Sequence, residues 1–149
     1  NEGEKELVQF RYGLQGHSSN VNAVKFSPNG RYLATASDDK MIAFGKCETI
    51  SSALALLSGS NDGAVSTASG TLAEVIDIKW SSNSKYLVSA GMDKRIIVWL
   101  VEKCRYDRIL DEHNKFVQGI AVDAKFHYIV SMSNDRSAKV WKNSNTKKT

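Results

Sequence analysis

Residues 21–39 read Val21-Asn-Ala-Val-Lys-Phe-Ser-Pro-Asn-Gly-Arg-Tyr-Leu-Ala-Thr-Ala-Ser-Asp-Asp39. The pattern returns without gaps at 75–93, as Val75-Ile-Asp-Ile-Lys-Trp-Ser-Ser-Asn-Ser-Lys-Tyr-Leu-Val-Ser-Ala-Gly-Met-Asp93. It returns again at 117–135, as Val117-Gln-Gly-Ile-Ala-Val-Asp-Ala-Lys-Phe-His-Tyr-Ile-Val-Ser-Met-Ser-Asn-Asp135. Self-similarity of this kind indicates an architecture built from one repeated structural unit.

The spacing of the repeats identifies the unit. The second repeat starts 54 residues after the first, and the third starts 42 residues after the second. A period of about 40 to 45 residues is typical of a β-propeller blade. The first interval therefore contains an insertion of about 12 residues. We divide the chain into blade one (about 14–46), an insert (47–70), blade two (about 71–110), blade three (about 111–142) and a basic tail (143–149).

Each repeat reads as strand, turn, strand, turn, strand. In the first, Val24 and Phe26 alternate with Ala23 and Lys25. The following Ser-Pro-Asn-Gly predicts a turn, because proline fixes one φ angle and glycine accepts a positive one. No segment holds a helical period over three turns, so short β-rich runs with regular turns favour an all-β fold. The remaining strands are expected at 32–36 and 41–44, at 75–80, 86–90 and 95–99, and at 117–122, 128–132 and 138–141.

A fourth strand is expected in the connectors, at 6–12 and 104–110. The fold class is therefore an all-β propeller fragment of three four-stranded antiparallel blades. Three blades form an incomplete ring, because propellers contain about four to eight. Edge strands and end blades would be left uncovered, so we expect the isolated chain to be poorly stable or to self-associate. The chain also lacks an initiator methionine, which fits a piece of a longer protein.

Composition narrows the function classes. The chain is 42% hydrophobic and 24% charged, as in a soluble globular protein. Its best apolar run, 50–57, is too short for a membrane span, and its N-terminus does not resemble a secretory signal. Part of the net charge of +4 comes from the C-terminal end of the chain, where Lys142, Lys147 and Lys148 lie. A phosphate-tracking surface carries a denser basic stripe, so we do not expect direct nucleic-acid binding.

The sequence offers no sign of a metal or a cofactor. Cys47 and Cys104 form no Cys-x-x-Cys pair and have no metal-ligand spacing with the three histidines. We expect both to be reduced thiols. The glycines of the insert match no phosphate-binding loop, since no Gly-Lys-Ser/Thr follows them. No small-molecule substrate is expected either.

The repeats resemble WD repeats. Gly16-His17 followed by Asp39 is similar to the opening of such a repeat, and Trp99 and Trp141 stand where its tryptophan belongs. The resemblance implies a hydrogen-bonded tetrad of histidine, serine or threonine, aspartate and tryptophan in each blade. Its members here would be His17, Thr35 and Asp39 in blade one, Ser89, Asp93 and Trp99 in blade two, and His113, Ser131, Asp135 and Trp141 in blade three.

The sequence departs from the WD pattern at several of these positions. Gly45 stands where blade one should have its tryptophan, and Thr71 stands at the histidine position of blade two. The residues after the tryptophans, Leu100 and Lys142, are not aspartate. Because a polar network that is only partly satisfied is weaker, we expect blade one to be the loosest.

His113, Ser131 and Asp135 also have the residue types of a catalytic triad. The same set recurs as His17, Thr35 and Asp39, however, and a catalytic triad has no reason to repeat in each structural unit. No Gly-x-Ser-x-Gly nucleophile elbow surrounds Ser131. The sequence therefore predicts a protein that is not an enzyme.

A closer resemblance is carried by 33–42, which is followed by a long insert, and by 113–119, Asp123, 128–129 and 133–141. These segments resemble the N-terminal propeller of the HIRA family of histone chaperones. The resemblance implies a nuclear interaction scaffold that acts in replication-independent deposition of histones H3 and H4 and in transcriptional repression. The propeller subunit of chromatin assembly factor one is the neighbouring alternative, and a generic WD adaptor outside chromatin is another.

Propellers bind partners through loops at the rim of the central channel. On this pattern the rim loops are 18–20, 72–74 and 114–116, together with the residue before each tetrad aspartate. Phe116 and Met92 are the best anchors, because aromatic and flexible apolar side chains dominate interface energetics. Tyr32, Tyr86 and Tyr128 recur at one repeat position and are expected to serve packing. The candidate rim residues are Ser19, Asn20, Asp38, Glu74, Met92, Lys115, Phe116 and Asn134.

Overall fold

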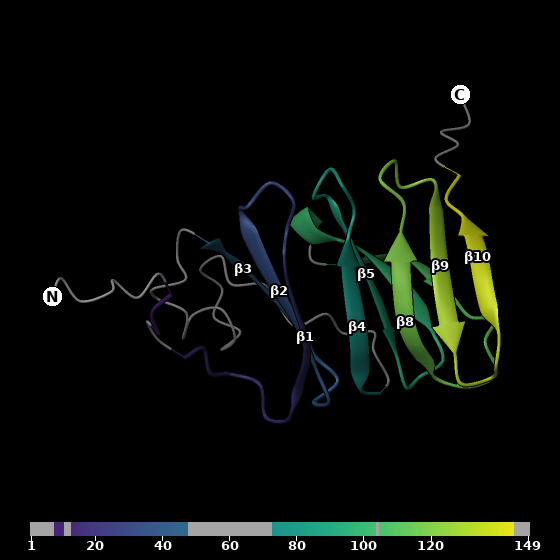
Figure 1. Ribbon diagram of the computed structural model, residues 1–149, viewed down its shortest axis with the longest axis horizontal. Helices are drawn as coiled ribbons and strands as arrows, with labels where there is room; N and C mark the ends of the chain where they lie inside the picture. Colours follow the sequence, from purple (N-terminus) through teal and green to yellow (C-terminus); the bar gives the residue numbers. More distant parts are fainter. Residues whose placement is uncertain (1–7, 11–12, 48–72, 104, 145–149) are drawn as a thin grey trace, which may run out of the picture.

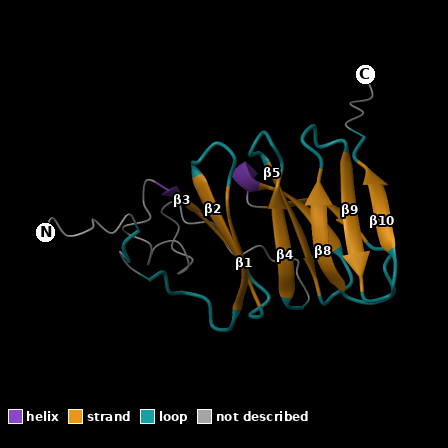
Figure 2. Cartoon of the chain, in the orientation of Figure 1, coloured by secondary structure: helices purple, strands orange, loops and turns teal. Residues whose placement is uncertain are grey.

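The computed structural model describes residues 8–10, 13–47, 73–103 and 105–144. Within them the chain forms three antiparallel sheets that stand side by side, one for each repeat (Figure 1, Figure 2). The all-β blade architecture is thereby confirmed. Blade one contains β1 (Val21–Phe26), β2 (Tyr32–Ser37) and β3 (Ile42–Lys46). Blade two contains β4 (Val75–Trp80), β5 (Tyr86–Gly91), β6 (Ile96–Leu100) and β7 (Arg105–Leu110), and blade three contains β8 (Val117–Val122), β9 (Tyr128–Ser133) and β10 (Ala138–Lys142).

The three blades share one strand register. Val24 pairs with Thr35, Ile78 with Ser89 and Ile120 with Ser131, all at the same position of the repeat. The first strand of every blade also carries a bulge or irregularity at its second residue, between 21 and 23, 75 and 77, and 117 and 119. Such a device bends the strand and increases its twist. Residues at equal repeat positions can therefore be compared directly between blades.

The turns repeat as faithfully as the strands. The first hairpin turn places Gly30, Ser84 and Phe126 at positive φ, between 55° and 71°. The second places Lys40, Lys94 and Arg136 at 68° to 69°. Of these six residues, only Gly30 could be predicted from the sequence to adopt this left-handed conformation, because residues other than glycine rarely adopt it.

The strand ends differ slightly from the sequence expectation. Met41 and Arg95 lie just before β3 and β6, and β2, β5 and β9 each extend one residue further. The strand expected at 104–110 is found as β7, which pairs with β6 and follows a 3-10 turn at Val101–Lys103. Of the strand expected at 6–12, residues 8–10 are described and are not in a strand. The rest of that segment, Cys104 and nearly all of the insert lie outside the described residues.

The core lies between the blades rather than within one of them. The face of blade one carrying Ala34, Ile42 and Phe44 packs against Leu87 and Trp99 of blade two. The opposite face of blade two packs against blade three through Val88, Ala90, Ile96 and Val98 on one side and Val117, Ile120, Phe126 and Ile129 on the other. Blade two is thus sandwiched between its neighbours, whereas blades one and three are each covered on one face.

The recurring tyrosines belong to these contacts. Tyr32 stacks on Trp80 of the next blade, with ring centroids 6.3 Å apart. Tyr86 stacks on Phe126 of the blade after it, at 5.4 Å. Tyr128 is at the same position of blade three, where no described blade follows, and is exposed. The packing role predicted for the first two tyrosines is therefore confirmed.

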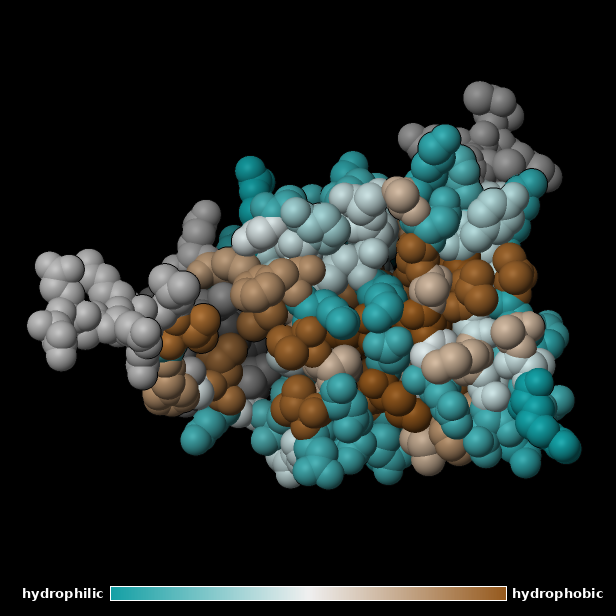
Figure 3. Space-filling model, viewed as in Figure 1, coloured by the Kyte–Doolittle hydropathy of each residue, from teal (hydrophilic) through white to brown (hydrophobic). Residues whose placement is uncertain are grey.

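The outward faces of the two end blades are apolar and open. Val21, Val24 and Phe26 are exposed on blade one. Val130, Met132 and Val140 are exposed on blade three, and apolar surface is visible over β9 and β10 in Figure 3. The equivalent positions of blade two, Val88, Ala90 and Val98, are buried. The end faces therefore have the composition of an interface between blades.

Candidate functional site

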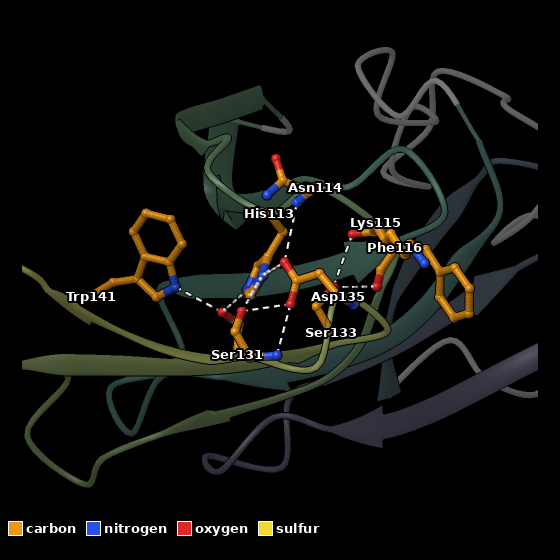
Figure 4. A network of polar contacts seen from close by, with 9 residues as sticks. His113, Asn114, Lys115, Phe116, Ser131, Ser133, Asp135 and Trp141 are labelled. Atoms are coloured by element: carbon orange, nitrogen blue, oxygen red, sulfur yellow. Dashed lines mark hydrogen bonds and ion pairs between the residues drawn. The ribbon is translucent and has the colours of Figure 1, made fainter.

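The predicted polar tetrad of blade three is assembled in full (Figure 4). His113 Nδ1 lies 2.8 Å from Asp135 Oδ2, and its Nε2 lies 2.7 Å from Ser131 Oγ. Trp141 Nε1 donates to the same Ser131 Oγ at 2.9 Å. The backbone N–H of Asn114 also donates to Asp135 Oδ2. These bonds join four segments of blade three: the loop that contains His113, β9, the turn after β9, and β10.

The donors and acceptors fix the direction of each bond. An ionised carboxylate only accepts, so His113 Nδ1 carries the proton that it shares with Asp135. In the neutral imidazole Nε2 then accepts from the Ser131 hydroxyl, which leaves Oγ to accept from the indole. Ser131 is completely buried. A partner able to react with this hydroxyl has no direct access to it, which favours a structural role over nucleophilic catalysis.

Blade one has the same trio without the indole. His17 Nδ1 lies 2.8 Å from Asp39 Oδ2 and Nε2 lies 2.7 Å from Thr35 Oγ, as in blade three. Gly45 pairs with Leu33, just as Trp99 pairs with Leu87 and Trp141 with Ile129. The structure therefore places Gly45 at the tryptophan position that the sequence assigned to it.

Blade two shows the other half of the network. Trp99 is almost fully buried and donates from Nε1 to Ser89 Oγ at 2.8 Å. Asp93 Oδ1 accepts the backbone N–H of Arg95 at 3.2 Å. Thr71, the residue at the histidine position, lies outside the described residues.

Two of the tetrad aspartates, Asp39 and Asp135, are held in their ionised form. At Asp135 the Ser137 hydroxyl, His113 and backbone N–H groups donate hydrogen bonds, which hold the pKa of this carboxyl far below its ordinary value. At Asp39 burial opposes ionisation, but hydrogen bonds from His17 and from the backbone of Ser18 and Met41 outweigh it and lower the pKa. The two sites therefore require charged carboxylates.

The predicted rim residues meet across each blade in pairs. Asp38 donates its backbone N–H to Asn20 O, Met92 to Glu74 O, and Asn134 to Phe116 O, at 2.9 to 3.1 Å. Ser19 and Lys115 lie in the same loops, where their carbonyl groups accept from Ser37 Oγ and Ser133 Oγ. All eight candidates therefore line one end of the three sheets. Phe116 is half-buried, whereas Met92 is exposed.

A hollow of about 530 Å³ opens at this rim between blades one and two. Two carboxylates, a thioether and an amide surround it, together with the side chain of Ile76. Asn22 Nδ2 donates to Asp38 Oδ1 at 2.7 Å and so orients that carboxylate. The lining residues are Asn22, Asp38, Glu74, Ile76 and Met92. Its negative charge and flexible apolar wall suit a basic side chain of a peptide.

Three side chains that the sequence reasoning missed tie the blades together. Asn22 Nδ2 also donates to Val75 O, and Trp80 Nε1 donates to Lys25 O. Asp77 Oδ2 accepts the backbone N–H of Ile120 at 3.1 Å. The residues at the same repeat position in blades one and three are Ala23 and Gly119. The carboxylate of Asp77 was therefore the one sign in the sequence that this position makes a polar contact in blade two.

No group of three or more potential ligand side chains is placed to hold a metal ion within the described residues. The same part of the chain contains no helix with the length and apolar character needed to cross a membrane.

Blades with one register, one interblade core and a buried histidine–hydroxyl–indole network define a WD-type β-propeller fold. The sequence profile of the CAF1B/HIR1 beta-propeller domain matches residues 1–149. The chain therefore belongs to the CAF1B/HIR1 β-propeller family.

Individual relatives agree with this assignment. The CAF1B subunit of chromatin assembly factor 1 from Gallus gallus is 37% identical over 153 residues, which cover 97% of this chain and 27% of the relative. Protein HIR1 of Aspergillus oryzae is 31% identical over 136 residues, which cover 87% of this chain and 13% of the relative. The chain thus spans about a quarter or less of these relatives. Among solved structures, that of U3-55K superimposes with a TM-score of 0.72 at 27% identity, over 87% of this chain and 38% of the other.

Proposed function

We propose that this chain is a non-catalytic interaction module of a histone-chaperone complex, and that it works in the nucleus on histones H3 and H4. Membership of the CAF1B/HIR1 β-propeller family carries the proposal. The HIRA resemblance extends it to replication-independent histone deposition and transcriptional repression. The buried state of Ser131 supports the absence of catalysis by the triad-like trio of blade three.

The rim supplies the binding surface in this proposal. Histones are basic, and the hollow between blades one and two presents Asp38 and Glu74 beside Met92. Charged groups at a rim steer association, while a flexible apolar side chain supplies contact area. A lysine or arginine would place its aliphatic stem on Met92 and Ile76 and its charge near the two carboxylates.

Charge reversal at the rim tests this proposal. The Asp38→Lys/Glu74→Lys variant should bind purified H3–H4 at least about tenfold more weakly than the wild-type chain, because like charges face each other across the interface. Glu102→Lys is the matched control. Glu102 is exposed and lies in the 3-10 turn after β6, where Val101 N–H donates to Lys85 O, just before β5 begins. Glu74 lies at the opposite end of β5, where it accepts the backbone N–H of Met92. Equal H3–H4 binding by all three proteins, measured by fluorescence titration at fixed salt, would exclude the rim as the histone site.

The role of the CAF1B subunit in chromatin assembly factor 1 is the second candidate. It is favoured by the 37% identity over nearly the whole chain, against 31% for the HIR1 relative. Affinity purification of the tagged protein from nuclear extract, followed by mass spectrometry, separates the two. Recovery of the other chromatin assembly factor 1 subunits supports this role, and recovery of HIR-complex subunits supports the first.

A further inference from the structure

We propose that the end of the blades opposite the rim binds the phosphate backbone of double-stranded DNA. This basal end consists of the turns between the first and second strands of each blade and of the segments that follow β6 and β10. It forms the upper edge of the sheets in Figure 1, whereas the rim forms the lower edge. Its residues are 27–31, 81–85, 101–103, Arg105, 123–127 and 142–144.

The basal end is built in the same way in all three blades. The residue before the second strand of each blade accepts, through its carbonyl oxygen, a backbone N–H group from the end of the third strand or just beyond it. The pairs are Cys47 to Arg31, Val101 to Lys85 and Asn143 to His127. The turn of blade one also touches that of blade two, where Asn29 N–H donates to Ser84 Oγ at 3.1 Å. Basic side chains at one repeat position therefore stand on adjacent turns.

Folding gathers at this end cations that are far apart in the sequence. Six lysines and arginines are exposed here, and none of them forms an ion pair with another described residue. They are Arg31, Lys85, Lys103, Arg105, Lys125 and Lys142. Only two carboxylates, Glu102 and Asp123, lie among the described basal residues. The fold thus forms a basic surface that no single stretch of sequence shows, against the expectation that nucleic acid is not bound.

The rim has the opposite balance of charge. Seven aspartates and glutamates stand there against five lysines and arginines, over residues 13–20, 38–41, 73–74, 92–95, 111–116 and 134–137. The carboxylate of Asp111 also lies 3.7 Å from Arg95, one of those five cations. The two ends of the sheets therefore carry net charge of opposite sign, and a polyanion is attracted to the basal end alone.

Blade two shows that the basal end stays accessible when both neighbouring blades are present. Its two faces are covered by blade one and blade three. Lys85, Lys103 and Arg105 of this blade are nevertheless exposed. Because blades stack through their faces, further blades in the ring would leave the basal turns at the surface.

The composition of the basal end favours DNA over a protein partner. Interfaces between proteins are depleted in lysine and use aromatic and methionine anchors. The large apolar side chains of the basal end, Val101 and Phe126, are buried, and hydrophilic surface predominates along this edge in Figure 3. Interfaces with DNA are more polar and much more positively charged. Exposed lysines and arginines without a reading element contact phosphates rather than bases, so binding should be independent of DNA sequence.

Fluorescence anisotropy with a labelled duplex of about 30 base pairs tests the proposal over a range of salt concentrations. The 149-residue chain should bind the duplex, and the logarithm of the binding constant should fall linearly with the logarithm of the salt concentration. Arg31→Gln/Lys85→Gln should bind at least about tenfold more weakly at about 50 mM salt, with a slope shallower by about two. The described hydrogen bonds of both residues are made by their backbone, so the variant should keep the wild-type circular dichroism spectrum.

Lys94→Gln/Arg136→Gln is the matched control. It removes one lysine and one arginine from exposed turns at the rim, so both double variants have the same net charge. It should bind DNA within about twofold of the wild type. Equal losses in the two variants, or a wild-type chain that does not bind DNA, would overturn the proposal.

A glutamate peptide separates DNA from an acidic protein segment as the ligand. A peptide with as many charges as the duplex should compete poorly with DNA for the wild-type chain. Tighter binding of the peptide than of the duplex would assign the basal end to a protein and would refute the assignment to DNA. The proposal goes beyond histone binding and does not depend on it, so each of these outcomes leaves the H3–H4 titration of the rim unaffected.

Discussion

At the scale of single residues, the acid sensitivity of the blades follows from two aspartates. Hydrogen bonds lower the pKa of Asp39 and Asp135 below the ordinary carboxyl value in the folded chain. A lowered folded-state pKa contributes stability that is complete above the unfolded-state pKa of about 3.9 and is lost as the pH falls below it. The direction of both shifts means that these two carboxyls lower the stability of the folded state in acid and contribute no pH dependence between neutral pH and about pH 5.

Asp135→Asn should remove part of this dependence. We expect the variant to be less stable than the wild type at pH 7 and to lose less stability between pH 5 and pH 3, because an amide cannot titrate. Urea unfolding followed by circular dichroism at several pH values gives both quantities. Glu102→Gln, at an exposed glutamate, is the control and should keep the wild-type profile. Identical acid profiles for Asp135→Asn and the wild type would contradict the role assigned to this carboxylate.

The indole hydrogen bond is the second determinant at this scale. Trp99 and Ser89 are both almost fully buried, so loss of the N–H donor leaves the serine oxygen without its partner. Trp99→Phe should lower the free energy of unfolding by about 1 to 3 kcal/mol. A double-mutant cycle with Ser89→Ala isolates the bond, with an expected coupling energy of about 0.5 to 1.5 kcal/mol. Strict additivity of the two substitutions would mean that the bond contributes nothing.

At the scale of strands, Gly91 and Gly119 differ in how well their surroundings can accommodate a side chain. A Cβ at Gly91 would overlap the carbonyl oxygen of Glu74, which is backbone and cannot move without shifting β4. A Cβ at Gly119 would lie 2.7 Å from Met132 Cε, the mobile end of an exposed side chain. Gly91→Ala should therefore destabilise the chain by about 1 to 3 kcal/mol, and Gly119→Ala by less than about 0.5 kcal/mol. Thermal melts of the two variants make the comparison, and the reverse order would contradict it.

Strand positions were predictable from the sequence because the repeat constrains them three times over. The alternation at Val24 and Phe26 and the turn ending in Gly30 located the first hairpin, and the aligned letters located the others. The left-handed turn residues Ser84 and Phe126 were not predictable, since the repeated hairpin geometry overrides their weak local preference. The contacts of Asn22 and Asp77 escaped prediction because they cross between blades, and the sequence of one repeat does not say how it meets the next. The missing tryptophan at Gly45 could be located from the sequence, whereas the close contacts of His17 with Thr35 and Asp39 are seen only in the folded chain.

At the scale of the whole molecule, stability depends on what covers the end blades. On blades one and two, the apolar side chains of the face toward the next blade are buried only because that blade packs on them. The same positions on blade three carry exposed Val130, Met132 and Val140, and the outer face of blade one exposes Val21 and Val24. These two surfaces repeat the two halves of each internal interface. In the isolated chain they are therefore expected to meet between copies, head to tail, at high protein concentration.

Val140→Lys tests that expectation. Val140 is 69% exposed, so the lysine should stay in water, leave the circular dichroism spectrum unchanged and shift the sedimentation profile toward the monomer. Val98→Lys is the matched control at the same repeat position of blade two, where the side chain is 1% exposed. It should unfold the chain, because an unpaired buried charge costs more than a domain of marginal stability can sustain. A wild-type chain that sediments as a monomer at every concentration and melts in one sharp transition would show that the open faces need no cover.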